Sequence, residues 1–161
     1  MIAPVPDDAA SDASPALPSA ALLTVERVAA LQRVRFFRDV PGHALVAVAR
    51  VLDEVRVDAG ESFIRPGAVE DWMFVVVDGC VRVLLEGRAV REIGSGGVVG
   101  DLAVLAPAPR SAEVVALEPT LLLKLRRAPF EELLDDHPEI ARAVIASLAG
   151  MLQSMPPVPA G

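Results

Sequence analysis

Gly100 and Arg110 lie ten residues apart in a segment whose residue types are suited to hold an anion. Gly100 precedes a short apolar stretch that is predicted to begin a helical turn, and Arg110 follows Pro109 at the other end of the segment. The first N–H groups of a helix have no acceptor within the helix, and the positive end of the helix dipole lies beside them. Arg110 adds a planar, permanent charge. These features predict a phosphate site, although a loop arginine that extends into solvent would have the same local sequence.

The composition of the chain limits the kinds of protein that can carry such a site. Its 161 residues fit one domain with short tails, and its net charge of -7 does not favour a nucleic-acid-binding surface. Cys80 is the single cysteine, so the chain can form neither an internal disulfide nor a multi-cysteine metal site, which fits a reducing cytoplasm. The uncharged C-terminal stretch is too short in its apolar part to span a bilayer. We therefore expect a cytoplasmic protein without a nucleic-acid partner and without membrane insertion.

Between residues 52 and 125, short valine-rich runs separated by glycines predict an antiparallel β-roll. Polar and apolar residues alternate in several of these runs, and Glu86-Gly87 is typical of a two-residue hairpin turn. Apolar residues at helical spacing predict helices on both sides of the roll. We expect two helices before the roll, at about 22–33 and 41–51, and two after it, at about 129–137 and 139–153.

The two ends of the chain differ in composition from this central region. Residues 1–21 are rich in Ala, Pro and Asp and are predicted to be a disordered tail, while residues 154–161 are predicted to be a flexible Pro-rich tail. No basic region precedes an apolar run near the start, so no signal peptide is predicted. Residues 22–153 are expected to form a single domain.

Three glycines and two short motifs within the predicted roll form a known pattern. Gly60 with the acid after it, Gly67, and Gly79 after a long strand precede Val-Gly-Asp-Leu-Ala-Val at 99–104 and Pro-Arg-Ser-Ala at 109–112. This resembles the cyclic nucleotide-binding domain family, in which Phe-Gly-Glu-Leu-Ala-Leu precedes Pro-Arg and a small residue at the same spacing. The resemblance implies an eight-stranded antiparallel β-roll, also called a jelly roll or double-stranded β-helix. N-terminal helices and two C-terminal helices flank this roll in Crp-like regulators and protein kinase A regulatory subunits.

The resemblance also implies roles for the residues of the two motifs in binding a cyclic nucleotide. Arg110 would pair with the exocyclic phosphate oxygens, and the N–H groups of Leu102 and Ala103 would donate to the same phosphate. Ser111 would add a hydroxyl contact, and Gly100 would let the backbone approach the ligand closely. A desolvated phosphate needs both kinds of donor to replace its water.

Asp101 departs from the family pattern, in which a glutamate accepts a hydrogen bond from the ribose 2′-hydroxyl. Aspartate is one methylene shorter, so two outcomes are open. Either the ligand or the loop shifts and ribose binding is kept at reduced strength, or the site no longer binds cyclic nucleotides usefully. Loss of a charged hydrogen bond costs about 1.5 to 3 kcal/mol, which weakens binding roughly ten- to hundredfold.

The base of the ligand is expected to contact the interior of the roll and the closing last helix. Ser111 leaves both adenine and guanine open. We expect cAMP rather than cGMP because cAMP is the commoner ligand among bacterial members of the family. The side chains expected at the base or in a covering lid are Val83, Leu85, Met151, Leu152 and Gln153.

An enzyme on a similar roll, such as a cupin, would need clustered metal ligands. His43 and His137 both fall in or beside predicted helices, away from the roll interior. A lone Cys80 also disfavours an iron–sulfur or haem sensor. We therefore expect a protein that is not an enzyme and needs no metal ion or cofactor.

A transcription factor of the Crp/Fnr type would require about fifty more residues after the last helix for its DNA-binding domain. We therefore expect a sensor that binds a cyclic nucleotide and signals through movement of its C-terminal helix. Its partner would be an effector protein or a second copy of the chain. The alternative is a degenerate member of the family that acts as a ligand-free protein–protein interaction module.

Overall fold

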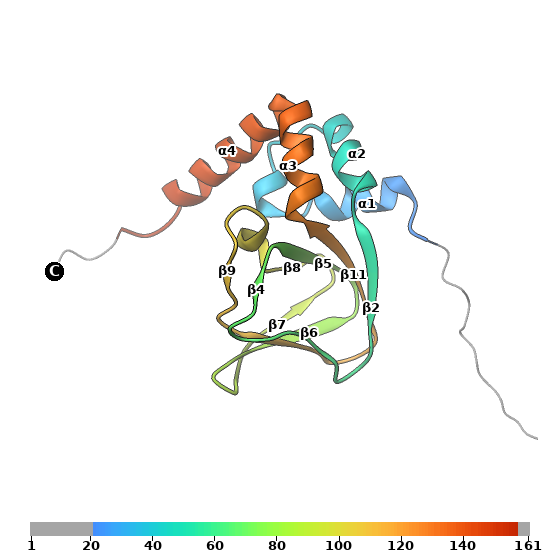
Figure 1. Ribbon diagram of the computed structural model, residues 1–161, viewed down its shortest axis with the longest axis vertical. Coiled ribbons are helices and arrows are strands. Elements are labelled where there is room, and N and C mark those ends of the chain that lie inside the picture. The colour runs from blue at the N-terminus through green and yellow to red at the C-terminus, as the bar shows by residue number, and fades with distance from the viewer. Residues whose placement is uncertain (1–20, 158–161) are drawn as a thin grey trace, which may run out of the picture.

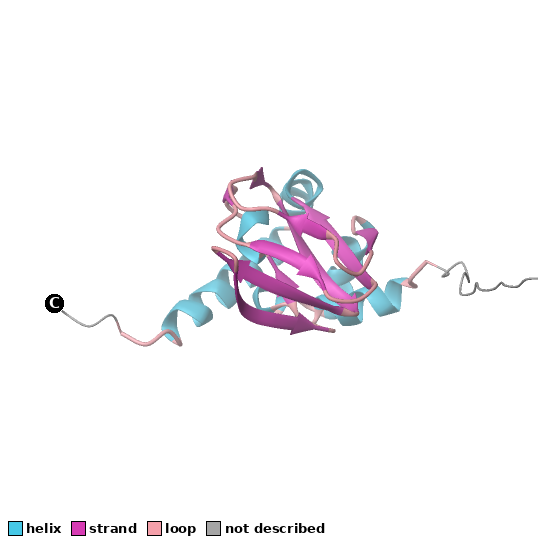
Figure 2. Cartoon of the chain, turned by 90° about the horizontal axis from the view of Figure 1, so that it is seen from below, coloured by secondary structure: helices cyan, strands magenta, loops and turns pink. Residues whose placement is uncertain are grey.

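Two antiparallel four-stranded sheets wrap around a common interior in the computed structural model, which describes residues 21–157 (Figures 1 and 2). The strand order is β3-β10-β6-β7 in one sheet and β2-β11-β5-β8 in the other. These strands confirm the eight-stranded antiparallel roll. Their bounds are β2 Asp53–Val57, β3 Ser62–Ile64, β5 Trp72–Asp78, β6 Cys80–Leu85, β7 Arg88–Gly94, β8 Val98–Val99, β10 Glu113–Ala116 and β11 Thr120–Arg126.

Strand β5 separates two apolar cores, which explains its continuous run of apolar residues. Side chains of successive strand residues point to opposite faces. Phe74 and Val76 therefore pack inside the roll, whereas Met73 and Val75 pack against the helices. Strand β11 divides its leucines between the two cores in the same way. Both faces of β5 are buried between Met73 and Val76, so the polar-apolar alternation of a half-exposed strand is absent there, whereas it appears at the end of β11 in Lys124 and Arg126.

The β6–β7 hairpin forms at the predicted turn. Glu86 and Gly87 both have positive φ angles, of 51° and 80°. Two successive residues with positive φ form the turn whose twist matches that of paired strands.

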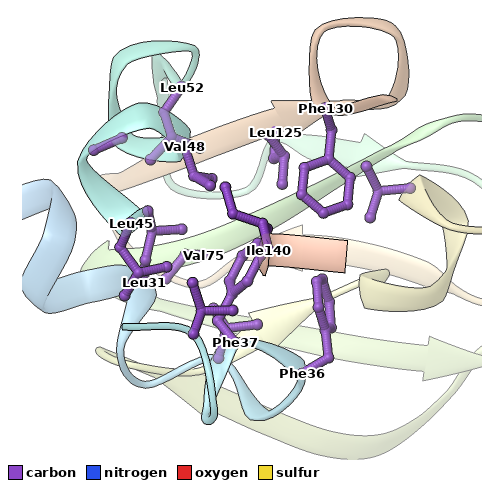
Figure 3. Close-up of a cluster of buried hydrophobic side chains, with 14 of the residues drawn as sticks. Leu31, Phe36, Phe37, Leu45, Val48, Leu52, Val75, Leu125, Phe130 and Ile140 are labelled. Carbon is purple, nitrogen blue, oxygen red and sulfur yellow. The ribbon is translucent and has the colours of Figure 1, made fainter. Parts of the chain in front are cut away.

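Four helices and a 3-10 turn cover one end of the roll within the described residues (Figure 1). Their largest buried side chains include Phe36, Phe37, Phe130 and Ile140, which meet in one cluster (Figure 3). Both predicted pairs of helices are therefore confirmed, with somewhat different ends. The bounds are α1 Thr24–Leu31, η2 Arg35–Phe37, α2 Gly42–Arg50, α3 Arg127–Asp136 and α4 Pro138–Gln153.

Helix α3 begins two residues before the predicted start at Pro129. The N–H of Arg127 donates to the Asp71 carbonyl (2.9 Å), and its guanidinium donates to the Leu105 carbonyl (3.1 Å). These contacts hold the first turn against the roll. Pro129 is tolerated there because N–H groups of the first turn have no acceptor within the helix.

Helix α4 is packed along only part of its length. Ile140, Val144 and Ser147 are buried, and Ser147 Oγ donates to the Asp39 carboxylate (3.0 Å) and accepts from the Asp39 N–H (3.2 Å). The C-terminal part of the helix runs outward from the roll (Figure 1). Leu148 and Met151 are only partly buried there, and Leu152 is 69% exposed. None of the helices between residues 21 and 157 has the length and apolar character that a membrane crossing requires.

The short strands β4 and β9 were not expected from the sequence, and most of the two predicted tails is undescribed. Strands β4 (Val69–Glu70) and β9 (Ala108–Pro109) form a separate ribbon, whereas the helical turn expected after Gly100 is present as the 3-10 turn η3 (Asp101–Val104). Elements this short show no periodicity that a sequence pattern can reveal. Residues 1–20 and 158–161, most of the two predicted tails, lie outside the described residues.

Candidate functional site

The β4–β9 ribbon fixes the backbone of Arg110. The Arg110 N–H donates to the Ala68 carbonyl (2.8 Å), and the Arg110 carbonyl accepts from the Gly67 N–H (2.8 Å). These two bonds extend the pairing of Val69 with Pro109 by one step. Arg110 is thereby held at the edge of the roll, although β9 itself has only two residues.

The guanidinium of Arg110 is buried and hydrogen-bonded on two sides. Its Nε donates to Glu70 Oε1 (2.8 Å), and Nη2 donates to the Trp72 carbonyl (2.5 Å). The Arg110 and Glu70 side chains are only 7% and 15% exposed. A buried charge is tolerated only when it is paired and hydrogen-bonded, and these contacts meet that condition. They also fix the plane of the guanidinium.

Gly100 lies against the remaining side of the Arg110 guanidinium. Its backbone is left-handed (φ 72°, ψ 31°), a conformation that costs other residues about 1 to 2 kcal/mol. A Cβ atom at this position would also collide with Nη1 of Arg110. Glycine is therefore required at this position for two reasons: the left-handed backbone and the close contact with Arg110.

Gly100 is also the residue that precedes the η3 turn. The Ala103 N–H donates to the Gly100 carbonyl (3.1 Å), so one of the two expected phosphate donors is used within the turn. The Leu102 N–H lies too early in the turn to find an acceptor inside it. The Leu102 side chain is 57% exposed, whereas Ala103 is buried.

A pocket of about 160 Å³ adjoins this group of residues. Gly100, Arg110, Ser111 and Ala112 line one side of it. The rest of its lining is Ile64, Val83, Arg91, Val99 and Val114.

Four of these lining residues form one row across the sheet β3-β10-β6-β7. Val114 pairs with Ile64 on one side and with Val83 on the other, and Val83 pairs with Arg91. Directly paired residues project from the same face of a sheet. Three apolar side chains therefore line this side of the pocket, and Arg91 stands at the end of their row.

A second, larger pocket of about 510 Å³ shares Arg91 and Gly100 with the first. Arg33, Arg35 and Asp101 contribute to its lining. Sites that enclose a small organic ligand measure about 300 to 1,000 Å³. The smaller pocket is below this range by itself, and the two adjoining pockets together fall within it.

The structure brings together some of the expected site residues and separates others. Gly100, Arg110, Ser111 and Val83 line the smaller pocket, whereas Asp101 lines only the larger one. Of the expected base and lid residues, only Val83 lines the smaller pocket, and the others lie elsewhere in this structure, where the end of α4 runs outward from the roll (Figure 1). Leu85 is at the exposed end of the β6–β7 hairpin, Met151 lines a pocket with Asp39 and Ser147, and Leu152 and Gln153 are exposed.

Glu70 and Arg91 are the residues of this site that the sequence pattern did not identify. Glu70 is 40 positions away from Arg110 in the chain, on a strand of only two residues. A signal was available in principle, because a buried arginine requires a carboxylate partner. Arg91 lies on a polar, exposed part of β7 and shows no motif.

Metal ligands do not gather in this part of the chain. Between residues 21 and 157, no group of three or more His, Cys, Asp or Glu side chains is arranged to hold a metal ion. His137 instead contacts Glu139 (Nδ1 to Oε2, 3.4 Å) at the start of α4.

Comparison with known proteins identifies a family and several relatives of this chain. The model of the cyclic nucleotide-binding domain family matches residues 54–137. A cAMP-dependent protein kinase regulatory subunit from Yarrowia lipolytica is 32% identical over 120 residues, which cover 74% of this chain and 31% of that protein. A cyclic nucleotide-gated potassium channel from Rhizobium etli is 36% identical over 111 residues, which cover 69% of this chain and 31% of that protein. The chain thus spans about a third of the length of these curated relatives.

A solved structure shows the same fold. The N-terminal domain of a transcriptional regulator from Streptomyces coelicolor A3(2) superposes with a TM-score of 0.72 at 24% identity, over 77% of this chain and 90% of that one. The family match spans more than half of the chain and includes β5 to β11, Glu70, Gly100 and Arg110. This chain belongs to the cyclic nucleotide-binding domain family.

Proposed function

We propose that this chain binds a 3′,5′-cyclic nucleotide with its phosphate in the pocket that Gly100, Arg110 and Ser111 line. The observation that carries the proposal is the Arg110 guanidinium, which is buried, oriented by Glu70 and the Trp72 carbonyl, and set against a pocket. Two of its five N–H groups are used by these contacts, so donors remain for an anion. Because Glu70 and Trp72 already hold the side chain, little further ordering is needed when the ligand binds.

The other contacts to the phosphate follow from the same pocket. Ser111 lines it beside Arg110, and the Leu102 N–H lies at the start of η3. The Ala103 N–H would contribute only by sharing its hydrogen bond with the Gly100 carbonyl. Asp101 lies on the side of the larger pocket, and it would meet the ribose only if the sugar extends past Gly100.

The proposed output of binding is a change in the position of α4. The Ser147–Asp39 contact ties its middle to the segment after η2, while Leu148 and Met151 beyond it are only partly buried. Closure over the ligand would require α4 to leave or bend beyond this contact. We propose that a cytoplasmic effector protein, or a second copy of the chain, reads the change as a regulatory signal without catalysis by this chain.

A second candidate function is a ligand-free interaction module. Two observations favour it: the Ala103 N–H is already used, and Asp101 does not line the smaller pocket. Replacement of Asp101 by glutamate separates the two functions. In a weakened sensor, Asp101→Glu would tighten cyclic nucleotide binding about tenfold, because a charged hydrogen bond to the ribose is regained. Unchanged or absent binding in that variant would favour the module.

The proposal is tested by calorimetric titration of the chain with cAMP and with cGMP. The wild type is expected to bind with one-to-one stoichiometry. Arg110→Ala is expected to lose about 2 to 5 kcal/mol of binding free energy, as when one partner of a buried charged contact is removed. Arg126→Ala is the matched control, since its side chain is 52% exposed and pairs with Asp53 away from the pocket. Absence of heat from the wild type at millimolar ligand would contradict the proposal.

A further inference from the structure

A second arginine of this chain lies against a glycine, at the turn between β7 and β8. Gly96 has a positive φ angle of 89°, and a Cβ atom there would collide with Nη1 of Arg33. The turn is itself fixed to β5, since the Gly96 N–H donates to the Val76 carbonyl (2.7 Å) and the Val76 N–H donates to the Gly97 carbonyl (2.8 Å). The Arg33 side chain is therefore packed on a held segment of backbone.

Arg35 projects from the same side of the chain as Arg33. Val34, the residue between them, has an extended backbone (φ -77°, ψ 126°), and its side chain is buried in the core of the helical end. Successive side chains of an extended segment point in opposite directions, so both arginines point away from that core. Both of them line the larger pocket of about 510 Å³.

The charges of these two arginines have no partner in the part of the chain that the structure describes. No ion pair and no side-chain hydrogen bond there involves Arg33 or Arg35. The other charged residues of the pocket lining are Arg91, Glu92 and Asp101. Glu92 pairs with Arg82 (2.7 Å), which leaves one unpaired carboxylate, Asp101, against three arginines. The lining is thus positive, although the whole chain has a net charge of -7.

Unpaired arginines in a pocket of this size are suited to hold a phosphate group. A guanidinium offers parallel N–H donors that match phosphate oxygens, and hydrogen bonds between charged groups are the strong ones. We propose that the larger pocket binds a phosphate group through Arg33 and Arg35. This phosphate is additional to the one proposed at Arg110, and its site does not depend on that proposal. Because the two pockets share Gly100, the second phosphate belongs either to the same nucleotide or to a separate molecule.

Calorimetric titration of the full chain with pyrophosphate tests this site. At about 0.15 M salt, attraction between distant charges is screened. Pyrophosphate is expected to bind the wild type and to bind Arg110→Ala as well. In Arg33→Ala and in Arg35→Ala its affinity should fall about tenfold, because each variant loses a charged hydrogen bond. Both side chains are exposed, so thermal unfolding without ligand should show that the two variants are folded.

Arg38→Ala is the matched control, because Arg38 is an exposed arginine of the same segment that lies outside the larger pocket. It should keep the wild-type affinity for pyrophosphate.

The source of the second phosphate is identified with 3′,5′-cyclic diadenosine monophosphate, which carries two phosphates. If one nucleotide supplies both groups, this compound binds, and its affinity falls in Arg33→Ala and also in Arg110→Ala. If separate molecules supply them, cAMP and pyrophosphate bind the chain together. Both results support the site at Arg33 and Arg35.

Four results would overturn the inference. These are no binding of either probe to the wild type, unchanged affinities in Arg33→Ala and Arg35→Ala, loss of pyrophosphate binding in Arg110→Ala, and an equal weakening in Arg38→Ala. The last result would mean that a basic surface attracts anions without a defined site. Failure of cAMP and cGMP to bind would instead contradict the proposed function and would leave the pyrophosphate test intact.

Discussion

At the scale of single residues, the site depends on how a buried cation is held. The Arg110 guanidinium contacts a carboxylate, a carbonyl and a glycine that come from β4, β5 and the turn before η3. Together these contacts hold the side chain in one orientation. Loss of any one of them should therefore move the guanidinium or leave its charge without a partner. Gly100 offers the clearest test, because it contacts Arg110 without forming a hydrogen bond to it.

We predict that Gly100→Ala weakens cyclic nucleotide binding and stability together. The substitution strains a left-handed backbone by about 1 to 2 kcal/mol and forces the Arg110 guanidinium away from its position. Gly87→Ala is the matched control: Gly87 also has positive φ, but a Cβ there meets no atom within 4 Å. Both variants should unfold at lower denaturant concentration, and only Gly100→Ala should lose affinity by calorimetry. Equal affinities in the two variants would show that the contact with Arg110 is irrelevant to binding.

Some residues of the site can be identified from the sequence, and others cannot. Gly100 and Arg110 are close in the chain and are framed by a recognisable motif, so they could be identified before the structure was known. Glu70 and Arg91 could not, because their proximity to the site is created by strand pairing: β4 with β9, and β7 with β6. Such pairing brings distant segments together without a local sequence signal.

At the scale of elements, ionic contacts attach the N-terminal helix to the roll. Glu54 on β2 accepts from the Leu22 N–H (2.6 Å) and from Arg27 of α1 (2.9 Å). Burial raises the pKa of the Glu54 carboxyl, but these hydrogen bonds and the Arg27 charge outweigh it and hold the pKa below the ordinary value of 4.5. The carboxylate form is thus the one that the folded chain stabilises.

We predict that this contact makes part of the stability dependent on acidity. Above the ordinary carboxyl pKa, Glu54 is ionised in both the folded and the unfolded chain, and its full contribution is present. As the pH falls through and below 4.5, the unfolded chain takes up the proton first, so the contribution is lost. Glu54→Gln should therefore be less stable than the wild type at neutral pH, and the difference should shrink in acid.

Chemical denaturation at a series of pH values measures this difference. Asp53→Asn is the control on the same strand, since Asp53 is half exposed and pairs with Arg126 rather than with α1. A destabilisation by Glu54→Gln that is the same at neutral and acidic pH would contradict the assignment.

The second element-level prediction concerns α4. Ser147→Ala removes the two hydrogen bonds to Asp39 and should cost about 1 kcal/mol or more, since Ser147 is buried. Backbone amides of α4 should then exchange hydrogen faster, as measured by mass spectrometry. Ser154→Ala is the control, because its exposed hydroxyl contacts only the Met151 carbonyl. Unchanged exchange in Ser147→Ala would show that apolar packing alone positions the helix.

The elements themselves were largely predictable from the sequence. The hairpin at Glu86 and Gly87 and the helices on both sides of the roll follow from turn chemistry and apolar spacing. The placement of α4 could not be predicted, because the Asp39–Ser147 contact joins residues 108 positions apart. Periodicity identifies the apolar face of a helix but not the surface that the face covers.

At the scale of the whole molecule, two strands join the roll interior to the helical end. Strands β5 and β11 contribute alternate side chains to both apolar cores, and the Trp72 carbonyl that holds Arg110 lies on β5. A ligand that shifts the Arg110 guanidinium would therefore also shift β5, and β5 packs against the helices. Close packing transmits such shifts because core side chains have little free volume.

The central claim, that a cyclic nucleotide places its phosphate in the pocket lined by Gly100, Arg110 and Ser111, is tested most directly by nuclear magnetic resonance. In a titration of the isotope-labelled chain with cAMP and then with cGMP, we predict the largest shifts at the amides of Gly100, Leu102 and Ser111 and at the Nε–H of Arg110. An absence of shifts at saturating ligand, or shifts confined to the separate pocket around Met151, would contradict the account.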